Sequence, residues 1–164
     1  MIEPKHLLNY VIRPVLKDLG LHSQNAERLV LGTACQESQC GRWLKQLGDG
    51  PALGIYQMEP ATHDDIWANY LNLRSDLLTR VIPKWAIMMP EPINAWQMVG
   101  NLYYATAMCR IHYLRVLEII PDNLPGQAAY WKRFYNTALG KGHVDEYIRH
   151  WRQFIGEDSL TVWV

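Results

Sequence analysis

The sequence lacks a net charge. Its 164 residues include 16 Lys and Arg and 16 Asp and Glu, and no basic run stands out. Nucleic-acid-binding domains usually carry a basic excess or a basic stripe, because phosphate contacts supply much of the affinity. The composition therefore predicts no nucleic-acid partner.

Long apolar runs are also missing, and we expect no leader sequence. The sequence contains no stretch of about 18 apolar residues, which argues against a membrane span. The first residues, MIEPKHLLNYVIRPVLKDLG, space their apolar side chains, and no small-residue cleavage site follows them. We expect a chain that has no membrane span and is cytoplasmic when synthesised.

Cysteine is scarce, with Cys35, Cys40 and Cys109 as the full set. Three cysteines make no disulfide framework, and an odd number favours reduced thiols. The spacing of the cysteines relative to His22 and His63 matches no tetrahedral zinc pattern. We therefore expect no metal and no cofactor.

Apolar residues and polar aromatics are abundant. The chain is 49% hydrophobic and has 7 Trp and 9 Tyr but only 2 Phe. A domain of this length buries roughly 68–70% of its unfolded surface, which is enough for one core. Alternation with a period of two residues is scarce, and no linker divides the chain. The expected fold is mainly α, with residues 1–164 in a single domain.

Apolar spacing and capping residues predict the helices. The first should be interrupted at Pro14 and stop before Gly20. The second should begin after an N-cap at Ser23, and a capping box of Thr62 and Asp65 should open the third. Residues 39–58 are rich in glycine and predict a loop or short hairpin, and residues 86–92 predict a break. The expected helices cover about 7–19, 24–38, 62–72, 75–83, 96–119, 125–138 and 143–155.

Glu37 is the most informative residue. It lies at the C-terminal end of an apolar predicted helix, where burial and the negative end of the helix dipole should raise the pKa of its carboxyl group. A raised pKa is what a general acid requires at neutral pH. The glycine-containing return at 54–62, GIYQMEPAT, would place Tyr56 and Gln57 beside it. Glycosidic bond cleavage needs such a proton donor within a polar shell.

These elements resemble the soluble lytic transglycosylases. That family has a helix ending in Glu-Ser, then Gly-Leu-Met-Gln-hydrophobic-x-Pro-x-Thr, and later Tyr-Asn-Ala-Gly-x-Gly. Here Glu37-Ser38, GIYQMEPAT and the segment YNTALGKG at 135–142 occur in the same order within residues 25–145. The resemblance implies a lysozyme-like domain with Glu37 as the catalytic acid and base. It also implies a set of substrate-binding residues: Ser38, Tyr56, Gln57, Tyr135 and Asn136.

The sequence departs from the family pattern at three points. Tyr56 stands where the family has Met, residues 137–139 lengthen the Tyr-Asn element, and Gln39-Cys40 is an unusual continuation after the Glu-Ser pair. The Gly-Asp-Gly at 48–50 resembles goose-type lysozymes, in which an Asp about a dozen residues after the Glu can assist hydrolysis. Asp49 lies 12 residues after Glu37. Its simpler interpretation is a turn residue, since Asp-Gly favours turns.

The resemblance implies cleavage of the MurNAc-β-1,4-GlcNAc bond of peptidoglycan. In a transglycosylase, Glu37 would protonate the glycosidic oxygen and then accept the proton of the muramic acid 6-hydroxyl, giving a 1,6-anhydro product. The alternatives are a lysozyme that uses Glu37 with Asp49 and a non-enzymatic wall-binding or virion module. We favour the transglycosylase because of the Tyr-Asn element. Its partner would be the glycan strands of the periplasm or cell wall, reached by holin-dependent release or as part of a virion.

Overall fold

In a computed structural model the described residues are 1–86, 94–137 and 140–156, and the break expected at 86–92 falls almost wholly outside them. The described part is built from helices, and its sheet-like pairing is limited to isolated bridges of Leu53 with Lys45 and with Met58. The mainly α class is therefore confirmed for these residues. The elements are α1 (Pro4–Leu7), the π-helix η1 (Leu8–Ile12), α2 (Arg13–Asp18), α3 (Gln24–Ser38), α4 (Pro60–Asn69), the 3-10 helix η2 (Leu71–Leu73), α5 (Ser75–Ala86), α6 (Gln97–Gly100), α7 (Leu102–Leu114), α8 (Leu124–Trp131), the π-helix η3 (Lys132–Asn136) and α9 (Val144–Phe154).

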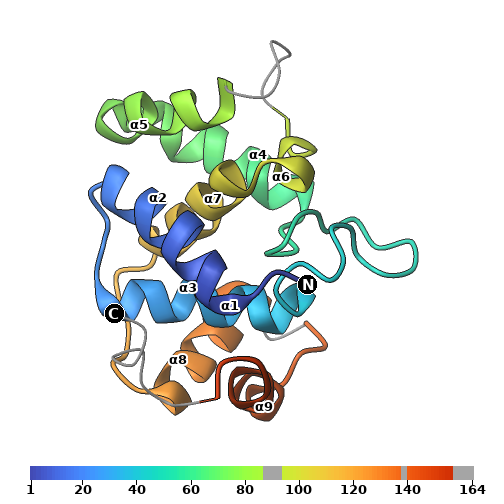
Figure 1. The fold of residues 1–164 in the computed structure, drawn as a ribbon. Helices are drawn as coiled ribbons and strands as arrows, with labels where there is room; N and C mark the ends of the chain where they lie inside the picture. The colour runs from blue at the N-terminus through green and yellow to red at the C-terminus, as the bar shows by residue number, and fades with distance from the viewer. Residues whose placement is uncertain (87–93, 138–139, 157–164) are drawn as a thin grey trace.

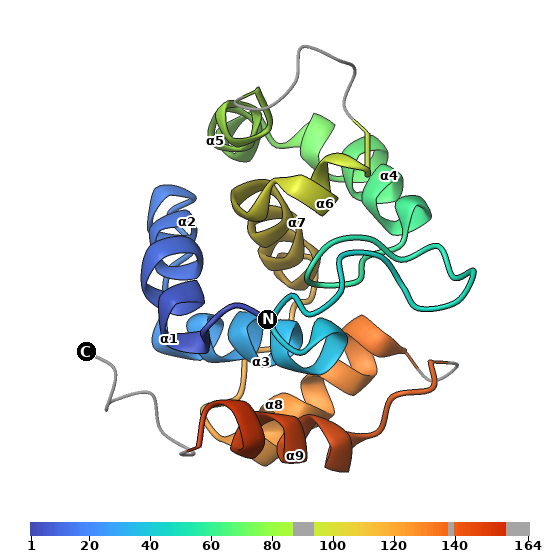
Figure 2. The same cartoon turned by 45° about the vertical axis from the view of Figure 1, so that its right-hand side comes forward.

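Helix α7 occupies the centre of the molecule. It packs against α2, α3, α4 and α5, and Figures 1 and 2 show it between α3 on one side and α4 and α5 on the other. Nearly every residue from Tyr104 to Ile111 is buried, as its apolar sequence predicts. The expected single helix over 96–119 is wrong, because Asn101 separates α6 from α7. Its side chain accepts a hydrogen bond from the backbone N–H of Tyr104 at 3.0 Å and caps α7.

Helix α3 contains Glu37 in its last turn, and capping residues define both of its ends. Its N-cap is Ser23, as predicted, and the Ser23 hydroxyl accepts a hydrogen bond from Ala26 N at 3.1 Å. Along its length it crosses α9 closely at Gly32, where an added Cβ would collide with the hydroxyl of Tyr147. The helix ends at Ser38 because Gln39 adopts a left-handed conformation with φ 50°.

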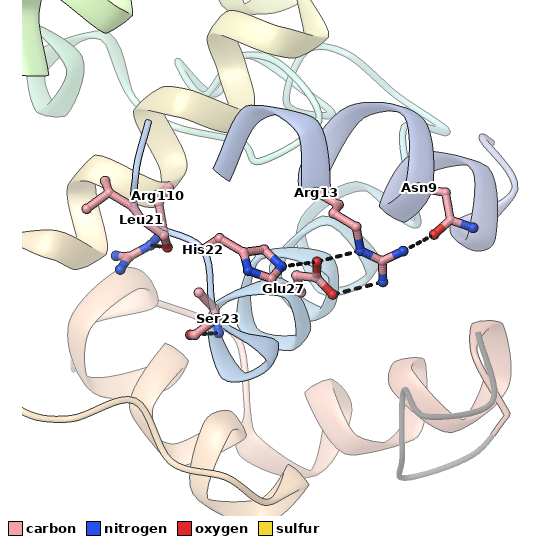
Figure 3. Close-up of polar contacts among 8 residues, drawn as sticks. Asn9, Arg13, Leu21, His22, Ser23, Glu27 and Arg110 are labelled. Carbon is pink, nitrogen blue, oxygen red and sulfur yellow. Dashed lines mark hydrogen bonds and ion pairs between the residues drawn. The ribbon is translucent and has the colours of Figure 1, made fainter. Parts of the chain in front are cut away.

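A partly buried ion pair joins α2 to α3 (Figure 3). The guanidinium of Arg13 donates to both carboxylate oxygens of Glu27, at 2.7 and 3.0 Å, and Glu27 is only 2% exposed. The Arg13 guanidinium also donates to Asn9, and His22 Nε2 lies 2.7 Å from Glu27 Oε1. Removing Arg13 would leave the buried Glu27 carboxylate with His22 as its remaining close partner, which should destabilise the fold. This network fixes the N-terminal half of the site helix.

Several helix boundaries differ from the sequence-based expectations, and α7 ends at Leu114 rather than near residue 119. Helix α4 begins at Pro60, so the capping box of Thr62 and Asp65 is wrong; proline suits the first helical turn because the missing N–H has no intrahelical acceptor there. The side chain of Asp65 instead accepts hydrogen bonds from Asn69 and Arg115. Helix α5 continues past residue 83 to Ala86. The first helical stretch changes to a π-turn just before Pro14, which lies in the first turn of α2.

Candidate active site

Glu37 lies in the last turn of α3 and faces a cleft of about 780 Å³. Figure 2 shows the teal loop of residues 39–59 leaving this end of α3 and running between α4 and the orange α8–η3 segment. The indole N–H of Trp131, at the end of α8, donates to Glu37 Oε1 at 2.8 Å. The indole N–H of Trp43, in the loop, donates to the backbone carbonyl of Glu37 at 3.2 Å. One tryptophan therefore holds the side chain of Glu37 and another holds its backbone.

The environment of Glu37 favours the protonated carboxyl group. Burial raises its pKa from 4.5 to about 7, and the hydrogen bond from Trp131 opposes this increase. Among the described residues no Lys, Arg or His forms an ion pair with Glu37, although Lys141 and His112 also line the cleft. Burial also lowers the pKa of His112 to about 4, so its imidazole is neutral at pH 7. The cleft thus contains an acid that exchanges its proton near neutrality.

The loop after α3 brings Gln57 into the cleft. Gln57 has a left-handed backbone, with φ 47°, and its side-chain amide donates to the carbonyl of Gly54 at 2.8 Å. Gly54 has φ 73°, and a Cβ there would lie 2.5 Å from the carbonyl oxygen of Met98. The glycine therefore allows close approach of another part of the chain, rather than of a ligand.

Ser38 and Tyr56 lie behind the cleft and do not line it. The buried Ser38 hydroxyl donates to the carbonyl of Ile55 at 2.6 Å and accepts a hydrogen bond from Gly41 N at 2.8 Å. The Tyr56 hydroxyl is 2.9 Å from the Thr106 hydroxyl in the core. Both side chains attach the loop to the helices, and their predicted substrate contacts would have to be indirect.

Tyr135 and Asn136 line the same cleft from η3. The Tyr135 hydroxyl donates to the carbonyl of Tyr56 at 2.8 Å and so connects η3 to the loop across the site. Lys132 Nζ donates to Asn136 Oδ1 at 2.7 Å and to the carbonyl of residue 140 at 2.8 Å. These bonds span residues 137–139, which lengthen the Tyr-Asn element. Residues 138–139 lie outside the described ranges.

Among the described residues, the carboxylates that line the cleft are Glu37 and Glu59. Asp49, the proposed second carboxylate, is exposed in a turn at residues 48–49 and does not line it. Glu59 directly precedes α4 and is exposed. It belongs to the glycine-containing segment used for the resemblance, but the sequence argument assigned it no role.

No site role was assigned to Trp131 from the sequence either. Its ring is fully buried, yet its N–H reaches the Glu37 carboxyl. A signal for this was present, since Trp131 precedes Tyr135 by four residues, the spacing that places two side chains on one helix face. Trp43 had no comparable signal, because it lies in an irregular loop.

The described residues contain no group of three or more His, Cys, Asp or Glu side chains that could hold a metal ion. Nor does any helix in the described ranges combine the length and apolar character needed to cross a membrane. Comparisons with models of protein families, with curated proteins and with solved structures gave no match. The resemblance to lytic transglycosylases therefore stays a prediction from the residues.

Proposed function

We propose that this chain is a peptidoglycan lytic transglycosylase that cleaves the MurNAc-β-1,4-GlcNAc bond. The observation that carries the proposal is the Glu37 carboxyl group, whose pKa burial raises to about 7, in a cleft that also contains Gln57, Tyr135 and Asn136. General acids that work near neutrality need a pKa of this kind. The lysozyme-like character of the helical domain is part of the same proposal.

The hydrogen bond from Trp131 assigns different roles to the two carboxyl oxygens of Glu37. Because Oε1 accepts the indole N–H, we assign the acidic proton to Oε2. Oε2 would protonate the leaving 4-oxygen of GlcNAc while the bond to C1 of MurNAc breaks. The resulting carboxylate would then take the proton of the MurNAc 6-hydroxyl as that oxygen bonds to C1 and closes the 1,6-anhydro ring. Trp131 would stabilise the carboxylate between the two steps.

Hydrolysis is the second candidate, and the position of Glu59 favours it. An inverting glycosidase needs a second carboxylate about 6.5–9.5 Å from the acid to activate water. Glu59 lines the cleft, whereas Asp49 does not. If the chain is a lysozyme, we expect Glu59 to act as the base in place of Asp49.

A non-enzymatic wall-binding or virion module is the third alternative. A binding surface gains nothing from an ionisable group whose charged form is destabilised by burial, and glutamine would provide hydrogen bonds without that cost. The environment of Glu37 is therefore better suited to proton transfer than to binding alone. Release through a holin, or carriage in a virion, would bring a cytoplasmic chain to peptidoglycan in the periplasm or cell wall.

Mass spectrometry of the muropeptides released from purified sacculi tests these alternatives. The transglycosylase predicts products lighter by one water than the hydrolysed form, and E37Q should abolish their release. E59Q should retain anhydro products, and D49N is the matched control with an exposed carboxylate outside the cleft. Reducing-end products that disappear in E59Q would establish the hydrolase. A wild-type chain that sediments with sacculi but releases nothing would establish the binding module.

A further inference from the structure

Two cysteines meet at the C-terminal end of the helix that carries Glu37. Cys35 Sγ and Cys40 Sγ are 2.9 Å apart, and both residues are fully buried. A covalent S–S bond measures about 2.05 Å, so closure requires a movement of less than about 1 Å. The third cysteine, Cys109, is buried in α7 and has no sulfur contact of this kind among the described residues.

The backbone of the turn keeps this pair together. Gln39 and Cys40 are both left-handed, with φ 50° and 54°, and the Cys40 N–H donates to the carbonyl of Ala34 at 2.9 Å. The chain therefore folds back over the last turn of α3 and places the Cys40 side chain against Cys35. Left-handed residues other than glycine cost free energy, so this turn holds the two thiols together in a locally strained backbone.

We propose that Cys35 and Cys40 form a reversible disulfide when the chain meets a thiol-oxidising environment. The oxidant would be a low-molecular-weight or protein disulfide, RSSR. Cys40 as thiolate attacks one sulfur of RSSR and releases the first thiolate, RS⁻. Cys35 as thiolate then attacks Cys40 Sγ in the mixed disulfide and releases the second. The two released RS⁻ groups take up the two protons lost by the cysteines, so two thiols are oxidised and RSSR is reduced to two RSH.

The structure favours Cys40 as the first nucleophile. Cys40 lies in the turn after α3, so exposing it requires only residues 39–41 to open, whereas exposing Cys35 requires the last turn of α3 to unwind. Burial raises the pKa of the Cys35 and Cys109 thiols well above the ordinary value, which makes both poor first nucleophiles. Cys109 should remain a thiol because it lies in α7, outside the turn.

The disulfide would fix the turn that follows Glu37. It would close the short loop from Cys35 to Cys40 and lower the conformational entropy of the unfolded chain. For a loop this short and a domain of this size, the melting temperature should rise by roughly 4–8 °C. The proposal rests on the sulfur contact and the turn, and it holds whether or not the chain cleaves peptidoglycan.

The test uses the full chain, purified with reductant. Samples are equilibrated across a series of oxidised-to-reduced glutathione ratios, both as folded protein and during refolding from denaturant. They are then alkylated under denaturing conditions and mapped by peptide mass spectrometry. We expect Cys35 and Cys40 to lose their labels together and to appear as one crosslinked peptide lighter by two hydrogens, while Cys109 stays labelled. C109A is the matched control and should give the same crosslink.

Other results would overturn the proposal. Labelling of all three cysteines at every ratio, in both the folded and the refolded samples, would show that the pair does not oxidise. A crosslink that includes Cys109, or one that joins two chains, would show that the contact between Cys35 and Cys40 does not direct the pairing. The mapping of the wild-type chain decides the question even if a cysteine variant fails to fold.

Discussion

Replacing Glu37 by glutamine should stabilise the protein at alkaline pH while removing the acid. Burial raises the pKa of Glu37 from 4.5 to about 7, so above neutrality the folded state carries a charge in an unfavourable place. Glutamine has no charge to bury, and its oxygen can still accept the Trp131 N–H that now donates to Oε1 at 2.8 Å. The substitution therefore removes the ionisation and keeps the hydrogen bond.

The size and sign of the effect follow from proton linkage. Between pH 4.5 and about 7 the folded wild-type chain binds a proton at Glu37 that the unfolded chain has released. Its free energy of unfolding must therefore fall as pH rises through that range, and must be independent of this group below and above it. The difference of about 2.5 in pKa, at about 1.4 kcal/mol each, gives a loss of about 3 kcal/mol. E37Q lacks this loss.

Urea denaturation of wild type and E37Q from pH 4 to 9 measures the effect, because contributions from all other groups cancel in the difference. The difference should grow by about 3 kcal/mol in favour of E37Q between pH 4.5 and 8. This corresponds to roughly 6–12 °C in melting temperature. The new amide should also change the free energy of unfolding by a constant amount at every pH. This constant does not affect how the difference depends on pH. A difference that stays flat over this range would show that Glu37 ionises normally and would refute the assignment of the acid.

Four further substitutions concern the surroundings of the acid. Trp131→Phe removes a hydrogen bond that lowers the pKa of Glu37, so the alkaline limb of lytic activity, followed by turbidity, should move to higher pH. Tyr135→Phe should cost about 1–3 kcal/mol in urea denaturation, because the buried carbonyl of Tyr56 loses its donor. Tyr56→Phe should cost less, since the hydroxyl that it contacts still donates to a helix carbonyl. Gly54→Ala should cost more than about 2 kcal/mol, because its Cβ would press on a backbone carbonyl and φ is positive.

The helical architecture was largely readable from the sequence, since each helix buries a stripe of apolar side chains. Ser23 was identified as the cap of α3, and the helix ends where predicted. The predicted helix boundaries were wrong where a single polar residue or proline determines them. Asn101 interrupts an apolar stretch that periodicity treats as continuous, and Pro60 starts α4 ahead of the expected cap at Thr62. Periodicity predicts which face of a helix is buried. It does not predict where a single capping residue or proline begins or ends the helix.

The candidate site was predicted only in part, because a linear motif does not say which atoms of a residue are used. The structure places Glu37, Gln57, Tyr135 and Asn136 together on one cleft. It keeps Ser38 and Tyr56 behind that cleft and leaves Asp49 outside it. Trp131 was not assigned, because its four-residue spacing to Tyr135 indicates a shared helix face but does not say whether its N–H reaches the site.

The polar residues of the motif act mainly on the backbone. The side chains of Ser38, Gln57 and Tyr135 donate to the carbonyls of residues 55, 54 and 56, three consecutive positions in the loop. A loop with few helix or sheet hydrogen bonds needs such donors, because buried carbonyls without partners are costly. Three donors from three parts of the chain therefore hold one short backbone segment beside Glu37. The need to satisfy these backbone carbonyls is enough to place the three side chains here. It does not require any of their hydroxyl or amide groups to contact a sugar.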